Sequence, residues 1–521
     1  MILDVRARRQ FTHVAFVIFS ICAYWGCHEA PIDPSDESRK RNIILITVDA
    51  LRADAVGYMN DIPGRSPSLD LIAQESVIFT QAIASSSKTT ASMASLMTGR
   101  YPNFEDVKKW KPSTMYGFSD FAPATEKERP GLTSNVMMLA EILGASGYQT
   151  VGFNTNLNLS KFNNFHQGFE KYQQFQPYLR RIGEVRTHRL IGHYPPAPIV
   201  VSRVIRWLRN NQDDRPLFLW VHFMDPHSPY LPVNNDESAD PLQSGLSDLE
   251  INDAMYHLLL TQMGEQVRAA NYPRPDELRV DEETVVHEAF QLYNAEISYF
   301  DQEFSKLVAE LKASGLWKSS TVMITSDHGE EFLDHGFVSH HFRSAMAEEL
   351  IRVPLLVKPS RGETFEPGQR VEAVVRMVDF APTLLDYAGV DEDSYAEAHM
   401  DGTSLRTLVE GQQTRDRTAF ISTIEWGIVH NGKWKYRLEK PHNPTGESSE
   451  RLFLIRDDPM EERDVANEHP KQLAKMREQF KGFASALKNR QASGSSGVER
   501  PESTLSEEDR EHLEALGYFQ N

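Results

Sequence analysis

Three strand-like runs, far apart in the chain, each end in side chains that can bind a metal or transfer a proton. The runs cover residues 42–48, 217–223 and 319–326. Continuous, mostly apolar runs of this length are typical of central parallel strands that are buried on both faces. The carboxyl ends of parallel strands lie at one edge of a sheet, where open α/β sheets bind ligands. The pattern therefore predicts an α/β fold with its functional site at that edge.

The residues that follow the three runs are of metal-ligand types. They are Asp49 after the first run, Asp225 and His227 after the second, and Asp327 and His328 after the third. One such residue alone would be explained as a helix N-cap or a structural histidine. Caps explain three strand ends of this kind poorly. Because carboxylate oxygens and imidazole nitrogens suit Zn²⁺ or Mn²⁺, we predict a divalent-metal site at the sheet edge.

A short helix is predicted to begin at two neighbouring threonines. Met93, Leu96 and Met97 have the spacing of an amphipathic helix, which places Thr89 and Thr90 at its N-terminus. There, unpaired N–H groups and the positive end of the helix dipole favour an oxyanion. Taken alone, the threonines could simply cap the helix, since Ser and Thr are ordinary N-caps.

The charge balance excludes one class of function and constrains another. The formal net charge is −19, whereas a nucleic-acid-binding protein normally presents a basic face. An anionic substrate would need a strong local positive charge, most simply a metal ion. With 40% hydrophobic residues the chain can bury a sizeable core.

Residues 1–41 differ in composition from the rest of the chain. Three arginines precede an apolar stretch at 11–25, and both cysteines of the chain, Cys22 and Cys27, lie in this part. A basic segment followed by a short apolar one is typical of a secretory signal, and Cys27 stands where a bacterial lipoprotein would be lipidated. We expect export to the bacterial cell envelope or periplasm, with membrane contact through the N-terminus only. An uncleaved anchor is the alternative.

The remaining chain divides by composition into three parts. We expect a catalytic domain at 42–417, a smaller α+β subdomain at 418–490, and a flexible linker with a terminal helix at 491–521. Within the first part, the polar, acidic residues at about 231–280 are interpreted as a surface insertion that could cover the site. The sequence gives no indication of the oligomeric state.

Several sequence blocks resemble one known family. They are Asp-Ala-Leu-Arg-Ala-Asp at 49–54, Ser-Met-Ala-Ser-Leu-Met-Thr-Gly-Arg at 92–100, and the Asp-His-Gly-Glu and Asp-His-Gly motifs within 327–336. In these blocks the chain is similar to the sulfatase family of the alkaline phosphatase superfamily, over about residues 42–487. The resemblance implies an alkaline-phosphatase-like three-layer sandwich with a large, mostly parallel central sheet, plus a smaller C-terminal α+β subdomain.

The resemblance places Thr89 at the family's nucleophile position. Sulfatases proper carry there a Cys or Ser that is converted to formylglycine, which threonine cannot form. Thr89 instead looks like the unmodified threonine of phosphate-ester enzymes and of a sulfatase-like bacterial branch. Other family residues are also replaced: Ala50 stands at a second metal-binding Asp, Ala91 at a Pro, Met93 at an Arg, and Thr155 and His340 at Lys positions.

The mechanism implied by the resemblance is metal-dependent ester hydrolysis through a covalent Thr89 intermediate. The metal would be held by Asp49, Thr89, Asp327 and His328. His227 and His340 would bind the anionic group or protonate the leaving oxygen, and with Asp225 they could instead hold a second ion. Zn²⁺ or Mn²⁺ is expected rather than Ca²⁺.

The expected substrate is a small-molecule, lipid or glycan ester of phosphate, phosphonate or sulfate. Three alternatives stay open from the sequence. The first is an envelope transferase that moves a phospho-alcohol group through the same threonine, and the second is an inactive sulfatase-like binding protein. The third is a true sulfate-ester hydrolase that uses plain threonine.

Overall fold

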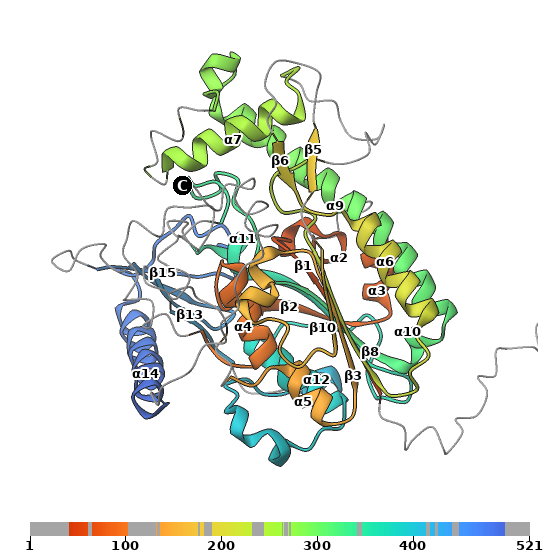
Figure 1. Cartoon of the computed structure of the whole chain (residues 1–521). Coiled ribbons are helices and arrows are strands. Elements are labelled where there is room, and N and C mark those ends of the chain that lie inside the picture. Colours follow the sequence, from red (N-terminus) through yellow and green to blue (C-terminus); the bar gives the residue numbers. More distant parts are fainter. Residues whose placement is uncertain are drawn as a thin grey trace, which may run out of the picture. The chain divides into compact units, whose positions relative to one another are not determined.

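The protein is described by a computed structural model (Figure 1). The structure describes residues 41–60, 65–102, 132, 136–175, 178–181, 190–231, 244–262, 264, 269, 272–340, 346–412, 417–422, 426–439 and 448–494. The expected signal segment, except Arg41, and the expected terminal helix lie outside these residues. Among the described helices, none combines the length and apolar character that a membrane span requires.

A large, mostly parallel sheet forms the centre of the catalytic part. Its strands run in the order β10, β2, β9, β8, β1, β7, β3, β4, and β11 also pairs with β2. Their bounds are β1 Asn42–Val48, β2 Val77–Ile83, β3 Gln149–Asn154, β4 Lys171–Gln174, β7 Leu217–Phe223, β8 Ser320–Ser326, β9 Arg352–Lys358, β10 Arg370–Val371 and β11 Val375–Arg376. The three strands expected to end in ligands are adjacent and parallel, with β1 between β7 and β8. Among the described strands of this sheet, only β9 runs antiparallel to its neighbours.

Side chains of the central strands enter two separate cores, one on each face of the sheet. Along β1, Ile44 and Ile46 belong to one core, whereas Ile43 and Leu45 belong to the other. Successive side chains of a strand point to opposite faces, so a strand buried on both faces must be apolar throughout. This is why a continuous apolar run, without alternation, indicated a central strand.

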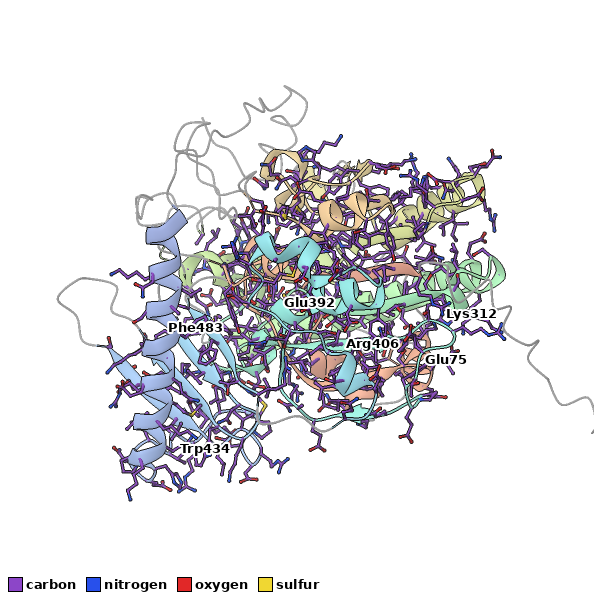
Figure 2. The ribbon with its side chains drawn as sticks, turned by 90° about the horizontal axis from the view of Figure 1, so that it is seen from below. Glu75, Lys312, Glu392, Arg406, Trp434 and Phe483 are labelled. Carbon is purple, nitrogen blue, oxygen red and sulfur yellow. The ribbon has the colours of Figure 1, made fainter. Side chains whose placement is uncertain are left out.

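Helices cover both faces and complete a three-layer α/β sandwich (Figure 1). One core contains residues of α3 (Pro67–Gln74), α6 (Ala197–Asn210), α7 (Asp248–Gln262) and α9 (Glu282–Ala313). The other contains residues of α4 (Thr89–Thr98), α5 (Leu139–Ala145) and α12 (Phe380–Tyr387). The end of α9 is joined to the loop after α3 by an ion pair of 2.7 Å between Lys312 and Glu75, both labelled in Figure 2. The predicted fold class is confirmed.

Short elements connect these layers. They are α2 (Gly57–Asn60), α10 (Leu316–Ser319), α11 (Glu348–Ile351), α13 (Arg406–Val409), the pair β5 (Tyr178–Arg181) and β6 (Leu190–His193), and the 3-10 turns Ala53–Ala55, Leu157–Leu159, Lys161–Asn163, Pro275–Leu278, Met377–Asp379 and Glu392–Ala398. The loop after β8 and the four-residue helix α11 matter most below, because both contribute to clusters of titratable side chains.

The residues interpreted as a polar surface insertion contain a well-packed helix. Ile251, Ala254 and Leu258 of α7 are buried in the same core as α9. Gln262, at the end of α7, accepts a hydrogen bond from the Val338 amide at 3.0 Å. The interpretation as a polar surface insertion therefore does not hold for α7, because its apolar residues pack into the core although residues 231–280 as a whole are polar and acidic.

A separate antiparallel sheet follows the catalytic part. It consists of β12 (Ala419–Ser422), β13 (Trp426–His430), β14 (Lys435–Glu439) and β15 (Ser449–Phe453), paired in chain order. The long helix α14 (Pro470–Gly494) runs beside these strands, and its Phe483 stacks on Phe420 of β12 at 4.7 Å (Figure 2). The helix α14 continues to Gly494, past Gln491 where the linker was expected to begin.

Candidate metal centre

Asp49, Asp327 and His328 lie together at the carboxyl edge of the central sheet. Val48, the last residue of β1, is paired with Ser326, the last residue of β8. Because the two parallel strands end in register, the residues that follow them, Asp49 and Asp327, lie side by side. The three side chains are fully buried, and each offers one ligand atom within 4.8 Å of the others. These are three of the four metal ligands that the sequence predicted.

One oxygen of each carboxylate is held in place and the other is left without a partner. Asp49 Oδ2 accepts hydrogen bonds from Asn156 Nδ2 at 2.6 Å and His222 Nε2 at 3.2 Å. Asp327 Oδ1 accepts from the Ala50 amide at 3.1 Å. Within the described part of the chain, Asp49 Oδ1 and Asp327 Oδ2 are buried without any hydrogen-bond partner. Buried polar atoms are normally satisfied, so this pair fits a bound cation.

His328 presents a nitrogen to the two orphaned oxygens. Its Nδ1 donates to the Gly329 carbonyl at 2.8 Å, which leaves the lone pair on Nε2. Nε2 lies 3.4 Å from Asp327 Oδ2 and 3.8 Å from Asp49 Oδ1. A histidine whose second nitrogen donates to a carbonyl is the usual arrangement of a metal-bound imidazole. The donor set thus suits a divalent cation, and its chemistry fits Zn²⁺ or Mn²⁺.

The charges of the site act on one another in opposite directions. Burial disfavours ionised Asp49, but the hydrogen bond from His222 and the nearby imidazoles outweigh it and lower the pKa of Asp49. Burial and the Asp49 charge raise the pKa of Asp327. For His328, burial opposes protonation, yet the two carboxylates raise its pKa. Two carboxylates this close cannot both be ionised at low cost without a positive charge between them.

Thr89 reaches this site from the first turn of α4. Lys88 is the N-cap in extended conformation, and Thr89 is the first helical residue, as predicted. Thr89 Oγ1 lies 3.2 Å from His328 Nε2. Ser92, one turn later, donates through Oγ to the Asp327 carbonyl at 2.6 Å and so ties α4 to the loop that carries two ligands. Met93 is fully buried in the core beneath the helix.

His227 and His340 stand next to this group. The ring of His340 lies 4.3 Å from that of His328 and 5.1 Å from that of His227, measured between centroids. His227 Nδ1 pairs with the Ser228 carbonyl at 2.6 Å, and His340 Nδ1 pairs with Glu330 Oε1 at 2.9 Å. Burial, followed by the charges of His328, His227 and Lys88, lowers the pKa of His340 well below its usual range.

Asp225 does not complete the second metal site that the sequence suggested. Among the described residues, Asp225, His227 and His340 do not form a group of three with ligand atoms within 4.8 Å. Burial raises the pKa of Asp225 to about 7, and its Oδ2 has no hydrogen-bond partner in the described structure. The two histidines thus remain as side chains beside the metal centre.

Four residues near the site were missed by the sequence reasoning. His222 interrupts the apolar run of β7; its Nδ1 accepts from Thr47 Oγ1 at 2.8 Å while Nε2 donates to Asp49. The single imidazole in an otherwise apolar strand was a usable signal. The others are Asn156, which holds Asp49; Glu330, which holds His340; and Lys88, whose charge acts on His340. Asn156 had no local signal, because its partner Asp49 is 107 positions away. Glu330 lies within the Asp-His-Gly-Glu motif, but the motif alone does not show that it holds His340.

The fold and the family model together place the chain in the alkaline phosphatase superfamily. The sequence matches the family model described as Sulfatase over residues 41–390, and one described as the C-terminal part of N-sulphoglucosamine sulphohydrolase over 334–486. The chain belongs to the sulfatase family. It is therefore an ester hydrolase of a metal-dependent family.

Individual relatives and solved structures agree with this membership. The ulvan-active sulfatase of Formosa agariphila is 26% identical over 411 residues, covering 75% of this chain and 70% of that protein. A structure solved with its substrate D-glucosamine-2-N,6-O-disulfate superposes with a TM-score of 0.63 at 18% identity, covering 88% of this chain and 100% of the other. The phosphonate monoester hydrolase of Agrobacterium radiobacter gives a TM-score of 0.61 at 18% identity, covering 86% and 96%.

Proposed function

We propose that this protein hydrolyses phosphate or phosphonate esters in preference to sulfate esters, through a covalent intermediate on Thr89. The observation that carries the proposal is the position of Thr89 Oγ1, which lies 3.2 Å from His328 Nε2 at the first turn of α4. This hydroxyl lies beside the candidate metal ligands, where it can attack an ester centre. It also lies at a helix N-terminus, where backbone N–H groups can bind the anionic group of the substrate.

The preference for phosphorus rests on the chemistry of threonine. A Thr89 ester has no second hydroxyl on the bonded carbon, so it can be released only when water attacks the phosphorus or sulfur centre. The family positions that carry Arg and Lys in sulfatases offer no cation here. Met93 is buried in the core, and Thr155 Oγ1 donates to the His222 carbonyl at 2.8 Å. Both features argue against the sulfate chemistry of the formylglycine enzymes.

A divalent cation, which we propose to be Zn²⁺ or Mn²⁺ bound by Asp49, Asp327 and His328, would supply Lewis-acid polarisation of the substrate's anionic oxygen. The chain's own groups account for the remaining steps. Asn156 and His222 hold Asp49 in its orientation, and Ser92 fixes α4 against the Asp327 carbonyl. The first N–H groups of α4, which have no acceptor within the helix, face negative charge that develops near Thr89.

The covalent chemistry balances in two steps. In the first, Thr89 Oγ1 loses its proton to solvent, forms a bond to phosphorus and expels the leaving alcohol. His227 gives that oxygen a proton from Nε2, which requires the doubly protonated ring, because Nδ1–H donates to the Ser228 carbonyl. His340, whose lowered pKa keeps it neutral, lies beside the anionic group and does not supply this proton. In the second step, water attacks phosphorus and the Oγ1–phosphorus bond breaks. One water is consumed, and an alcohol and phosphate, or a phosphonic acid, are released.

The test compares turnover on matched aryl esters with the metal content determined. Purified protein is assayed with an aryl phosphate, an aryl phosphodiester, an aryl phosphonate and an aryl sulfate. We expect the phosphorus esters to be turned over faster than the sulfate. Thr89→Ala should abolish turnover on all of them, whereas Thr90→Ala, a matched control one residue away, should retain most of it. Full turnover by Thr89→Ala would contradict the mechanism.

The intermediate itself can be observed. Wild-type enzyme quenched in acid during turnover should yield a peptide that contains Thr89 and carries the phosphoryl or phosphonyl group, as measured by mass spectrometry. An added alcohol that receives the group in place of water would show transfer rather than hydrolysis. Turnover of the sulfate alone, with an adduct on Thr89, would overturn the preference but keep the nucleophile.

The proposed site of action is the cell envelope. The proposal is supported by the basic and apolar pattern of residues 1–41 and by Cys27, which stands at a lipidation position. Fractionation of cells that express the full chain should find it outside the cytoplasm. Cys27→Ser should release it from the membrane fraction if the cysteine is lipidated.

A further inference from the structure

A second cluster of metal-ligand side chains lies outside the active site. Glu331 and His335 belong to the loop after β8, and Glu349 belongs to α11 (Glu348–Ile351). Each offers one ligand atom within 4.8 Å of the others. His335 Nδ1 lies 2.7 Å from Glu349 Oε1, and the His335 amide donates to Glu331 Oε1 at 3.2 Å. None of the three belongs to the Asp49, Asp327 and His328 group.

Glu331 has an oxygen with no visible partner. Its side chain is fully buried, and within the described structure Oε2 makes no hydrogen bond. Glu349 is also buried, and His335 is 13% exposed at its side chain. A buried carboxylate oxygen without a partner is costly unless a proton or a cation satisfies it. This is the same feature that marks the ligands at the sheet edge.

The imidazole of His335 is held so that a cation could replace one of its protons. Its Nε2–H donates to the Met460 carbonyl at 2.8 Å, and Nδ1 lies 2.7 Å from Glu349 Oε1, where a proton now bridges the two atoms and a metal ion could stand in its place. Metal-bound histidines usually donate their second N–H to a carbonyl or carboxylate in this way. Met460 lies in the segment after β15, so His335 also connects the active-site loop with the C-terminal part of the chain.

The charge of the cluster calls for a positive partner. Burial and the charge of Glu349 raise the pKa of Glu331 to about 8. Burial opposes protonation of His335, but the hydrogen bond to Glu349 raises its pKa to about 8. A divalent cation would balance two carboxylates and a neutral imidazole.

We propose that Glu331, His335 and Glu349 bind a second divalent cation, Zn²⁺ or Mn²⁺ by their donor types. The site is structural: it fastens the loop that carries His328, Glu330 and His340 to α11 and, through the Met460 carbonyl, to the C-terminal part. The loop is also held by the ion pair of 2.9 Å between Arg52 and Asp334. The proposal does not depend on which ester the enzyme hydrolyses.

The experiment counts metal ions in the full chain and in variants. Each protein is equilibrated with Mn²⁺ or Zn²⁺ alone, freed of excess ion and analysed for metal. Wild type should retain two ions per chain, and Asp327→Asn should retain one. Glu331→Gln should also retain one, and the double variant none. The control Glu310→Gln removes a carboxylate that belongs to neither cluster and pairs with the exposed Arg209, and it should retain two.

The outcomes separate this proposal from the proposed function. The proposal of a second site would be overturned if wild type retained one ion, or if Glu331→Gln retained two. The measurement on wild type does not depend on whether a variant folds. The second site would be supported if Asp327→Asn retained one ion and the double variant with Glu331→Gln retained none. This result is independent of the substrate assays. Loss of turnover in Thr89→Ala bears only on the proposed function.

Discussion

The two metal-ligand groups differ in how the chain positions them. Asp49 and Asp327 follow directly from two paired strands, and their backbone can hardly move without disturbing the central sheet. Glu331 and His335 lie on a loop, and Glu349 on a helix of four residues. A catalytic site needs ligands fixed to a fraction of an ångström, which strands provide. In a structural site, by contrast, the bound ion can itself fix the conformation of a loop and a short helix.

The surroundings of the two groups differ in the same sense. At the sheet edge, Asn156 follows β3 and His222 lies in the neighbouring strand β7, and both donate hydrogen bonds that orient Asp49. At the loop, the second nitrogen of His335 bonds to the Met460 carbonyl, 125 residues further along the chain. The first group is thus supported locally by the catalytic core. The group of Glu331, His335 and Glu349 connects the catalytic part to the C-terminal part, whose strands form separate sheets.

The largest effect should come from breaking the sheet-edge group. Asp327→Asn removes a ligand charge and should lower turnover by about 10³-fold or more, since the ion contributes several kcal/mol to the transition state. Glu331→Gln should lower turnover by less than about tenfold, because it leaves that ion in place. Steady-state assays at saturating metal compare the two. Equal losses would contradict the division into catalytic and structural groups.

The next effect concerns the contact between α11 and the C-terminal sheet. Lys435 of β14 is fully buried and pairs with Glu461 at 2.6 Å and Glu348 at 3.2 Å. Lys435→Met would remove the buried ammonium and leave Glu461 paired with Arg437 at 3.3 Å and Glu348 with His430 at 3.2 Å, which should cost about 3 kcal/mol of unfolding free energy. Lys481→Met, which breaks an exposed pair with Glu478, should cost less than about 1 kcal/mol. Chemical denaturation measures both.

A smaller effect is expected from the support beneath Asp49. Asn156→Ala removes the hydrogen bond of 2.6 Å to Asp49 Oδ2 and should weaken metal binding at the sheet edge by about 10–100-fold. Asn158→Ala, two residues away, is the control and should bind metal normally. Titration of metal-free protein, followed by recovery of activity, gives the affinity. An unchanged affinity in Asn156→Ala would mean that His222 alone orients Asp49.

The smallest effect is thermal. In the Asp327→Asn background only the loop site remains, so a chelator should lower the melting temperature by about 1–2 °C, which corresponds to one or two kcal/mol of binding free energy in a chain of this length. The Asp327→Asn, Glu331→Gln double variant should show no response to the chelator. Scanning calorimetry with and without chelator measures this difference. A shift that persists in the double variant would place the remaining ion elsewhere.

The sequence determined the parts of the protein that depend on local pattern. Apolar runs at 42–48 and 217–223 are strands with those bounds, and the ligands that follow the first and third runs meet because parallel strands end together. The helix spacing after Thr89 placed that hydroxyl at an N-terminus, as found. These features are readable because a buried strand or an amphipathic helix imposes its own period on the residues.

Only the tertiary structure decided what depends on distant partners. Asp225 follows a strand as Asp49 does, yet it forms no ligand group with His227 and His340. Glu331 and Glu349 lie 18 positions apart in a charged region, and nothing local shows that folding buries both beside His335. Composition likewise hid the apolar face of α7. The periodicity of the sequence shows which residues are buried. Which buried charged residues contact one another depends on the path of the loops in the folded chain.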